Sequence, residues 1–217
     1  AVQRVVARNQ ELGFTPPYEA AWEADDFISA KTVYIRPFSY AESGIGVDLS
    51  VNPWVIIVNT TVGSYFNLDS DASTTTTRRV RATPGGTGWM KCSGNYVISA
   101  LAKREAETAG CMEAIFLDAT EHRYLEEGSS CNLFAVLSDG TLVTPSLGDT
   151  ILPGITRQTV ITLAEEKGMT VEERRLSVEE VLDDAIEFFG TGTAAGVAHF
   201  GSLIHAGRTV TFGEGHI

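Results

Sequence analysis

The sequence predicts an α+β fold, in which short strands cluster and helices are interspersed among them. The first observation is a close succession of short β-branched and aromatic runs from residue 113 onward. The second is that two segments with helical apolar periodicity, at about 95–109 and 157–167, lie between those runs. The third is that strand and helix do not alternate regularly, as they do in a doubly wound parallel sheet.

Composition and charge limit the classes of partner. The 217 residues are 43% hydrophobic and 20% charged, which is typical of a globular protein with a substantial core. No apolar run reaches the 18 or so residues of a membrane-spanning helix, so we expect no membrane partner. The net charge of −12 argues against nucleic acid, because such binding begins with Lys and Arg neutralising phosphates. A small anion remains compatible, because a helix N-terminus binds one phosphate in a protein of any net charge.

The cysteines indicate a reducing compartment and no metal. Cys92, Cys111 and Cys131 are odd in number, and their spacing does not resemble a zinc site. We therefore expect reduced thiols in a cytoplasmic protein. Cys111 and Cys131 adjoin apolar runs and are expected in the core.

The first third of the chain predicts few regular elements. Residues 2–12 have the spacing of a short amphipathic helix. A strand is expected from residue 32 to Arg36, where Pro37 stops it. Residues 54–58 are apolar without alternation, which indicates a strand buried on both faces. The polar tract 73–77 is expected to be mobile.

The remaining two thirds predict three helices and many short strands. Val97, Leu101, Ala102 and Ala106 define the expected inner face of the helix at 95–109. A helix at 178–184 is predicted to begin with a capping box. Its members are Ser177 and Glu180. Strands are expected at 113–117, 123–126, 131–137, 141–144, 169–172, 186–189, 197–200, 202–205 and 209–212, with a hairpin turn at 138–140.

The most informative stretch places Lys91 between two glycine clusters, 85–88 and Gly94. Glycine allows a ligand to approach the backbone closely. An amine in a partly desolvated turn loses its proton more easily and becomes a nucleophile, so Lys91 is a candidate for a Schiff base. A helix that starts near Asn95 would bring the phenol of Tyr96 close to this amine.

Three further segments provide polar groups of the kinds that bind a charged ring and its phosphate. Glu127 follows a predicted strand, and its carboxylate would hold a pyridinium nitrogen in the protonated form. The N–H groups of Ile155 and Thr156 follow a glycine turn at a helix start, where a phosphate binds. The run 190–195 forms a second anion cradle. Each segment alone also fits an ordinary surface lysine, a solvated glutamate, a capped helix or a tight turn.

The order of these segments is more specific than any one of them, and it resembles the branched-chain amino-acid aminotransferases of the fold-type IV class of pyridoxal-phosphate enzymes. The matching motifs are Tyr34-Ile35-Arg36-Pro37, Gly63-Ser64-Tyr65-Phe66, Pro84-Gly85-Gly86-Thr87-Gly88 with Lys91 and Gly94-Asn95-Tyr96, Glu127 with Cys131-Asn132-Leu133-Phe134, Leu152-Pro153-Gly154-Ile155-Thr156-Arg157, and Gly192-Thr193-Ala194-Ala195. The resemblance implies the large domain of that class, with pyridoxal 5′-phosphate as cofactor.

The resemblance also implies roles for the residues around the cofactor. Lys91 would form the Schiff base and move the proton between Cα and C4′. Tyr96 would bond the ring oxygen, and Glu127 would pair with the pyridine nitrogen. The phosphate would be bound by Ile155, Thr156 and Thr193.

Four more residues would serve the substrate by the same resemblance. Ala194 and Ala195 would present N–H groups to its carboxylate. Tyr34 and Arg36 would line the pocket, and Arg36 would meet the distal carboxylate of glutamate.

The implied activity is exchange of amino groups between leucine, isoleucine or valine and 2-oxoglutarate, by a homodimer whose partners are small amino and 2-oxo acids. A D-amino-acid aminotransferase, an aminodeoxychorismate lyase and an inactive truncated fragment remain alternatives. We expect a piece of a longer protein that lacks an N-terminal lobe and the extreme C-terminus. Residues 1–40 would be a remnant of the small domain with the interdomain segment, and 41–217 the large cofactor-binding domain.

Overall fold

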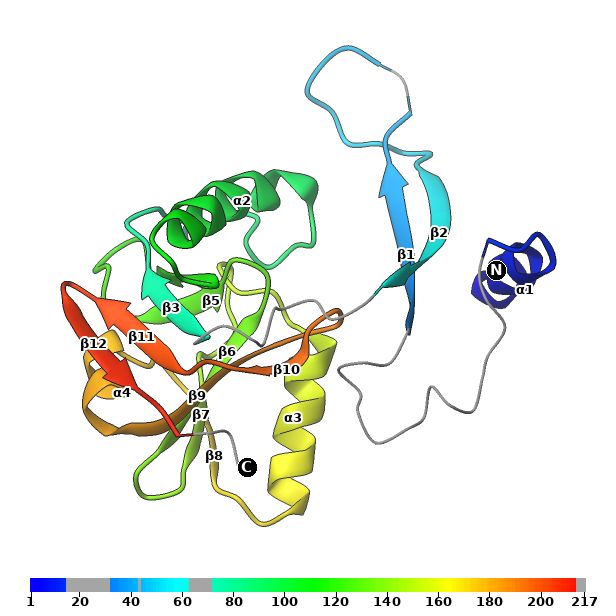
Figure 1. Cartoon of the computed structure of the whole chain (residues 1–217). Coiled ribbons are helices and arrows are strands. Elements are labelled where there is room, and N and C mark those ends of the chain that lie inside the picture. The colour runs from blue at the N-terminus through cyan, green and yellow to red at the C-terminus, as the bar shows by residue number, and fades with distance from the viewer. Residues whose placement is uncertain (15–31, 43, 63–71, 214–217) are drawn as a thin grey trace. The chain divides into compact units, whose positions relative to one another are not determined.

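The chain folds into two compact units, Ala1–Tyr65 and Phe66–Ile217, in a computed structural model that describes residues 1–14, 32–42, 44–62 and 72–213 (Figure 1). The expected division after residue 40 falls inside the first unit. The reason is that the two strands on either side of that position pair with each other along their whole length. The predicted motif at 63–66 lies outside the described residues.

The first unit contains one helix and one hairpin. The predicted N-terminal helix is confirmed as α1 (Val2–Glu11). Strands β1 (Thr32–Tyr40) and β2 (Trp54–Val62) form a two-stranded antiparallel sheet. Helix and hairpin are joined by a hydrogen bond of 2.6 Å from the amide of Asn9 to Oδ1 of Asn59.

Two expectations for this hairpin are wrong. Strand β1 continues through Pro37, which pairs with Ile57. Each strand of a two-stranded sheet has one open edge, and proline is tolerated where its missing N–H would face that edge. Strand β2 is not buried on both faces, since Trp54 is 63% and Val55 is 68% exposed.

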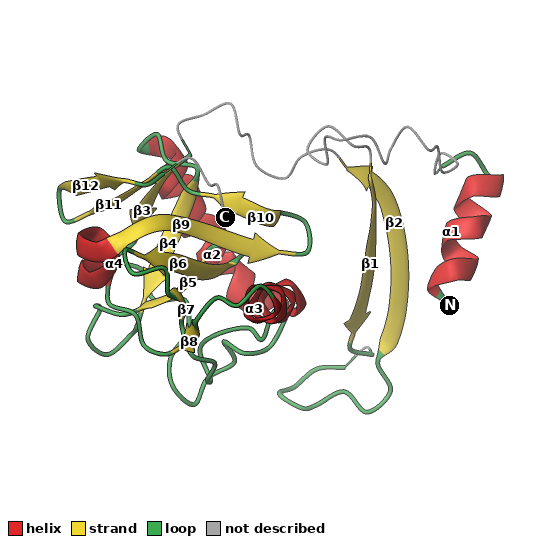
Figure 2. Ribbon diagram, turned by 90° about the horizontal axis from the view of Figure 1, so that it is seen from below, coloured by secondary structure: helices red, strands yellow, loops and turns green. Residues whose placement is uncertain are grey.

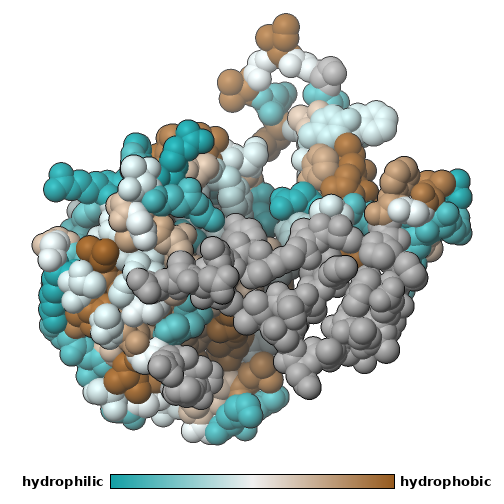
Figure 3. All heavy atoms as spheres, in the orientation of Figure 1, coloured by the Kyte–Doolittle hydropathy of each residue, from teal (hydrophilic) through white to brown (hydrophobic). Residues whose placement is uncertain are grey.

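The loop between β1 and β2 also exposes apolar side chains. Its residues Ile45, Val47, Leu49 and Val51 are all exposed. They belong to the tip of the hairpin, which has brown apolar groups in the space-filling view (Figure 3). This exposed apolar surface differs from the buried strand that the hydrophobic run at 54–58 predicts.

The second unit is built on one branched, largely antiparallel sheet (Figures 1 and 2). Its main path has the order β10-β9-β6-β5-β4-β3-β11-β12, and β7 and β8 branch from β6. The strands are β3 (Ser73–Thr76), β4 (Glu113–Leu117), β5 (Leu125–Gly128), β6 (Asn132–Leu137), β7 (Leu142–Thr144), β8 (Val171–Glu173), β9 (Ala185–Gly192), β10 (Gly196–His199), β11 (Ser202–His205) and β12 (Arg208–Thr211). The predicted α+β class is confirmed.

Strand β3 corrects the expectation that residues 73–77 are mobile. It lies inside the sheet, parallel to both β4 and β11. Thr74 is fully buried, and its hydroxyl donates to the carbonyl of Ser202 at 2.8 Å. The β-branched side chain of threonine suits a strand, and this hydrogen bond removes the cost of burying its hydroxyl.

Helix α2 (Ser93–Thr108) packs on β4, and helix α3 (Ile155–Glu166) packs on β6 and β7. The alternate residues of β4 and β6 point away from these helices into a separate central core. Because strand residues alternate between faces, Ala114 and Phe116 of β4 meet α2, and Ile115 and Leu117 enter the central core. Cys111 and Cys131 are buried as predicted, and all three cysteines are free thiols. Within the described residues, no helix has the length and apolar character needed to cross a bilayer.

The inner face of α2 differs from the prediction. Ala102 and Ala106 are buried as expected, but Val97 is 64% and Leu101 is 43% exposed. The rest of the buried face is polar and consists of Asn95 and Ser99. Small side chains on this face allow a close approach to β4, which apolar periodicity alone does not reveal.

Helix α4 (Val178–Asp184) shows half of the predicted capping box. The hydroxyl of Ser177 accepts a hydrogen bond of 3.1 Å from the N–H of Glu180. The carboxylate of Glu180 does not return the bond, because the guanidinium of Arg174 binds both of its oxygens.

The turn between β4 and β5 depends on a single carboxylate. Asp118 accepts hydrogen bonds of 2.8–3.2 Å from the backbone N–H groups of Thr120, Glu121, Arg123 and Tyr124. Partial burial disfavours its ionised form, but the four N–H groups outweigh this effect and lower the pKa of Asp118 to about 2.

We predict that this carboxylate makes stability depend on pH in the acid range. The folded pKa lies below the ordinary value of 3.8, so the contribution is fully present above about pH 5 and is lost as pH falls through 2. Asp118→Asn should cost about 2 kcal/mol near pH 6, and the difference from wild type should fall to roughly half by pH 3. Urea unfolding followed by circular dichroism at both pH values measures it. A difference that does not change with pH contradicts the assignment.

Candidate functional site

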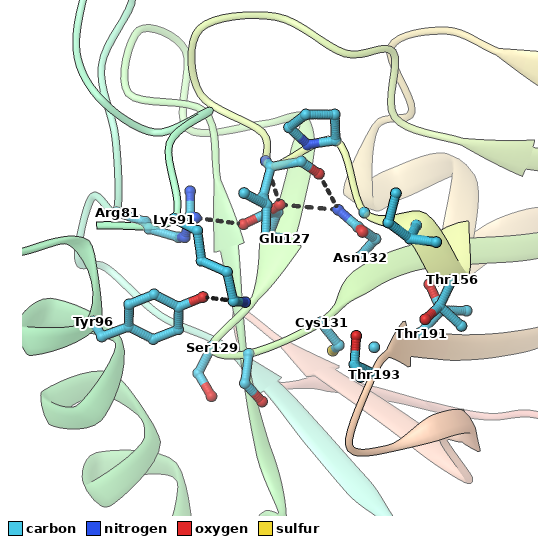
Figure 4. Close-up of a pocket in the computed structure, with 16 residues that line it drawn as sticks. Arg81, Lys91, Tyr96, Glu127, Ser129, Cys131, Asn132, Thr156, Thr191 and Thr193 are labelled. Carbon is cyan, nitrogen blue, oxygen red and sulfur yellow. Dashed lines mark hydrogen bonds and ion pairs between the residues drawn. The ribbon is translucent and has the colours of Figure 1, made fainter. Parts of the chain in front are cut away.

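The second unit contains a cavity of about 190 Å³, in which four distant segments meet (Figure 4). Its walls come from the loop around Lys91, the β5–β6 hairpin, the residues that lead into α3 and the end of β9. Strands β5, β6 and β9 are neighbours in the sheet, so their ends converge. The lining residues are Arg81, Lys91, Tyr96, Glu127, Ser129, Ser130, Cys131, Asn132, Leu152, Pro153, Gly154, Ile155, Thr156, Thr191, Gly192 and Thr193.

The loop that contains Lys91 is held from inside by Asn95. The amide of Asn95 donates to the carbonyls of Thr87 at 2.7 Å and Met90 at 2.9 Å. Its oxygen accepts from the hydroxyl of Thr87 at 3.0 Å. Because Asn95 lies in the first turn of α2, the helix fixes the backbone that precedes Lys91.

The loop before α3, which contains Asp149 and Thr150, also contacts the segment that precedes Lys91. The N–H groups of Gly85 and Trp89 donate to the side chain and the carbonyl of Asp149, each at 3.0 Å. Gly88 lies against Thr150, and a Cβ atom at Gly88 would be 2.7 Å from the Cα of Thr150. Glycine is therefore required for the close approach of these two loops.

Lys91 and Tyr96 contact each other directly. The ammonium of Lys91 donates to the hydroxyl of Tyr96 at 2.9 Å and lies 5.4 Å from the centre of its ring. The predicted proximity of the two side chains is confirmed. The expectation that Lys91 is partly desolvated is not, because its side chain is exposed.

Glu127 is the buried anionic group of the cavity. One carboxylate oxygen accepts from the N–H of Leu152 at 2.7 Å and from the amide of Asn132 at 2.9 Å. The other forms an ion pair of 2.7 Å with Arg81, and each side chain of the pair is only 5% exposed.

The charge on Glu127 depends on this pairing. Burial raises the pKa of Glu127, whereas the Arg81 charge and the Leu152 N–H act in the opposite direction. All three contacts donate toward the carboxylate, which favours its ionised form. Arg81 also donates to the carbonyls of Thr150 at 2.8 Å and Gly88 at 3.2 Å, so one guanidinium joins Glu127 to both loops.

The opposite side of the cavity suits an anion. Gly154 is the N-cap of α3, no side chain caps this end, and Ile155 and Thr156 of the first turn line the cavity. The hydroxyl of Thr191 is buried there without a hydrogen-bond partner. A buried hydroxyl without a partner costs free energy, and a ligand oxygen would relieve that cost. The free N–H groups of a helix N-terminus attract negative charge to the same place.

The structure gathers six of the ten predicted site residues around this cavity: Lys91, Tyr96, Glu127, Ile155, Thr156 and Thr193. Ala194 and Ala195 lie in the β9–β10 turn next to Thr193 and are not among the lining residues. Tyr34 and Arg36 belong to β1 in the first unit, where the guanidinium lies 5.1 Å from the centre of the tyrosine ring.

Among the lining residues to which sequence reasoning gave no individual role, three bear directly on the charge and hydrogen bonding of the cavity. Arg81 had no signal beyond its place in a short basic run at 78–81. Asn132 was noted only as part of a motif, although it orients Glu127. Thr191 is two residues before Thr193 in the same Gly-Thr-Gly-Thr run, and strand alternation would have favoured both hydroxyls on one face.

The fold and this constellation belong to a known class of proteins. The amino-transferase class IV family matches residues 21–203, and the chain belongs to that family. A probable branched-chain-amino-acid aminotransferase of Staphylococcus epidermidis is 41% identical over 189 residues, which are 83% of this chain and 52% of that protein. The chain spans about half the length of the curated relatives that it matches.

Solved structures give the same result and confirm the predicted fold. The T.th. branched-chain amino acid aminotransferase with pyridoxamine 5′-phosphate matches 84% of this chain and 61% of its own, with 34% identity and a TM-score of 0.72. The Escherichia coli branched-chain amino acid aminotransferase matches 99% of this chain and 72% of its own, with 30% identity and a TM-score of 0.72. The T.th. enzyme has also been solved with 4-methylvaleric acid and with N-(5′-phosphopyridoxyl)-L-glutamate.

We predict that the buried pair and an exposed pair respond differently to loss of their arginine. Arg81→Met leaves the Glu127 carboxylate buried without a cation, and should cost about 3–5 kcal/mol at neutral pH. Arg79→Met is the matched control, because the partner of Arg79 is the exposed carboxylate of Glu105 and the change should be small. Urea unfolding measures both. Equal losses of unfolding free energy in the two variants would show that the buried Arg81–Glu127 pair contributes no more than an exposed pair.

Proposed function

We propose that the protein to which this chain belongs transfers amino groups between branched-chain amino acids and 2-oxoglutarate, with pyridoxal phosphate bound in the cavity described above. The main supporting observation is that an amine, a buried carboxylate and an uncapped helix N-terminus surround one space (Figure 4). The relatives named above support the substrate class, since their names specify branched-chain amino acids.

The described residues fit pyridoxal phosphate at both ends of that molecule. The N–H groups of Ile155 and Thr156 would bind phosphate oxygens, and the hydroxyl of Thr193 would add a further donor. The unpartnered hydroxyl of Thr191 independently supports this placement, because a phosphate oxygen would satisfy it. When bound, pyridoxal phosphate supplies an electron sink that acidifies the proton on the substrate Cα.

Glu127 would bind the ring nitrogen at the other end. An ionised carboxylate accepts a hydrogen bond from a protonated nitrogen and stabilises its positive charge. Arg81 favours the ionised form of this carboxylate against the effect of burial, while Asn132 and the N–H of Leu152 orient it. These three donors thus fix the orientation of the Glu127 carboxylate in the cavity.

Lys91 would attach the cofactor and move the proton. Its amine would hold and move the proton that leaves the substrate Cα, as a general base and then a general acid. Tyr96 orients this amine through the 2.9 Å contact, and its phenol would also bond the ring oxygen.

Substrate selection would involve residues outside the cavity lining. We assign the N–H groups of Ala194 and Ala195 to the substrate carboxylate, and Tyr34 with Arg36 to the side chain, where Arg36 meets the distal carboxylate of glutamate. The ligands of the T.th. enzyme support this assignment, because one has a branched apolar chain and another contains glutamate. A cytoplasmic homodimer completes the proposal.

Covalent labelling tests whether this chain places the cofactor at Lys91. The chain is incubated with pyridoxal phosphate, reduced with borohydride, digested and analysed by mass spectrometry. We expect one phosphopyridoxyl group on Lys91, because the anion site and Glu127 direct the aldehyde there. Lys31, Lys103 and Lys167 serve as internal controls. No label, or label spread over all four lysines, would contradict cofactor binding by this chain.

The choice of amino donor separates the proposal from other activities of the class. In a separate sample that is supplied with pyridoxal phosphate and is not reduced, L-leucine and D-alanine are compared as donors to 2-oxoglutarate by following release of the 2-oxo acid. We expect turnover with L-leucine only, and none after Lys91→Ala. Preference for D-alanine indicates a D-amino-acid aminotransferase. Labelling without turnover from either donor indicates that the cofactor site forms but that the chain does not complete the substrate site.

A further inference from the structure

A buried carboxylate close to the cavity has no part in the chemistry proposed above. Glu113 is the first residue of β4 and is completely buried. The other residues of this strand, 114–117, are all apolar and completely buried. A carboxylate in such a strand is costly unless its oxygens accept hydrogen bonds, so the bonds that it accepts indicate what it does.

The hydrogen bonds of Glu113 to other elements both go to one turn. Oε1 accepts from the N–H of Ser129 at 3.0 Å and from the adjacent N–H of Ala114 at 2.8 Å. Oε2 accepts from the hydroxyl of Ser130 at 3.4 Å. The strands bring these groups together, because Ile115 of β4 pairs with Gly128 at the end of β5.

This turn is part of the cavity wall. Ser129 and Ser130 both line the cavity, and they directly follow Glu127 and Gly128 in the chain. Figure 4 shows Ser129 near Lys91 and Tyr96, across from the threonines at the anion end. The turn lies between Glu127 and Asn132, which pair across the hairpin, so its position also affects the carboxylate that faces the ring nitrogen.

We propose that Glu113 is a positioning residue that holds the Ser129–Ser130 turn as a wall of the cavity, and so sets the fit of pyridoxal phosphate. That pyridoxal phosphate is the ligand rests on the proposed function, whereas the effect of Glu113 on the Ser129–Ser130 turn does not. Glu113 touches the wall from behind, and acts only through the two serines.

Three substitutions separate positioning from general stability. Glu113→Ala removes both acceptors. Glu113→Gln keeps a carbonyl oxygen for the Ser129 N–H in a side chain of the same shape. Asp118→Ala is the matched control, since Asp118 also accepts backbone N–H bonds from a turn next to β4 but does not line the cavity. If Glu113→Ala does not fold, Glu113→Asp replaces it, because the shorter chain withdraws the acceptor from Ser129.

Two measurements are made on each variant: the dissociation constant for pyridoxal phosphate by absorbance titration, and hydrogen exchange of backbone amides at 128–131 without ligand. We expect Glu113→Ala to weaken binding at least about tenfold and to speed exchange at 128–131, as loss of a buried acceptor predicts. Glu113→Gln should remain within about threefold of wild type. Asp118→Ala should lower the melting temperature and leave both measurements unchanged.

The outcomes keep the two proposals apart. Unchanged affinity and exchange in Glu113→Ala, with only a lower melting temperature, overturn the positioning role while the proposed function stands. If the wild-type chain binds no pyridoxal phosphate, the proposed function fails for this chain, and exchange at 128–131 alone decides. If amides 128–131 then exchange faster in Glu113→Ala than in wild type, but not in Asp118→Ala, the positioning role of Glu113 is supported. If Glu113→Ala exchanges at the wild-type rate, or no faster than Asp118→Ala, that role is overturned.

Discussion

The buried ion pair between Arg81 and Glu127 is the interaction on which the cavity depends. Arg81 joins the carboxylate to the carbonyls of Gly88 and Thr150, so the lysine loop and the loop before α3 are held to the end of β5 by one side chain. Buried charges are costly, and such a pair is stabilising only when the remaining donors and acceptors are satisfied. Here Asn132 and the Leu152 N–H meet the second oxygen of Glu127. The same contacts that make the pair tolerable therefore also fix three walls of the cavity.

The sheet provides the rigid frame for this pair. Alternating residues of β4 and β6 pack into cores on both faces, which leaves little freedom for the strands between them. The strand ends that carry Glu127, Asn132 and Thr191 therefore have defined positions, and flexible groups such as Lys91 are oriented from that frame. Among the described lining residues, the hydroxyl of Thr191 is the one buried side-chain polar atom that has no hydrogen-bond partner. A cost at that point is consistent with a site shaped for a ligand rather than for the empty protein.

Much of the second unit and of its cavity could be predicted from the sequence, because the relevant signals are local. Glycines around Lys91, polar residues after Glu127 and the glycine before Ile155 mark chain ends and turns. Arg81 could not be recognised, since its meaning lies in a partner 46 positions away, at Glu127. The failures at β3 and at Pro37 have the same origin. Polarity suggested mobility at 73–77, and proline suggested a strand end, but pairing with distant strands decided both.

The two compact units suggest that cofactor binding and substrate choice have separate structural bases. Every group that we assign to pyridoxal phosphate lies between residues 81 and 193, in the second unit. The groups assigned to the substrate side chain, Tyr34 and Arg36, lie on β1 of the first unit, a two-stranded hairpin with an exposed apolar surface. The buried ion pair, the helix N-terminus and the sheet are all internal to the second unit. In our proposal, attachment of the cofactor to Lys91 therefore involves contacts within that unit, whereas discrimination among amino acids is assigned in part to residues of the hairpin.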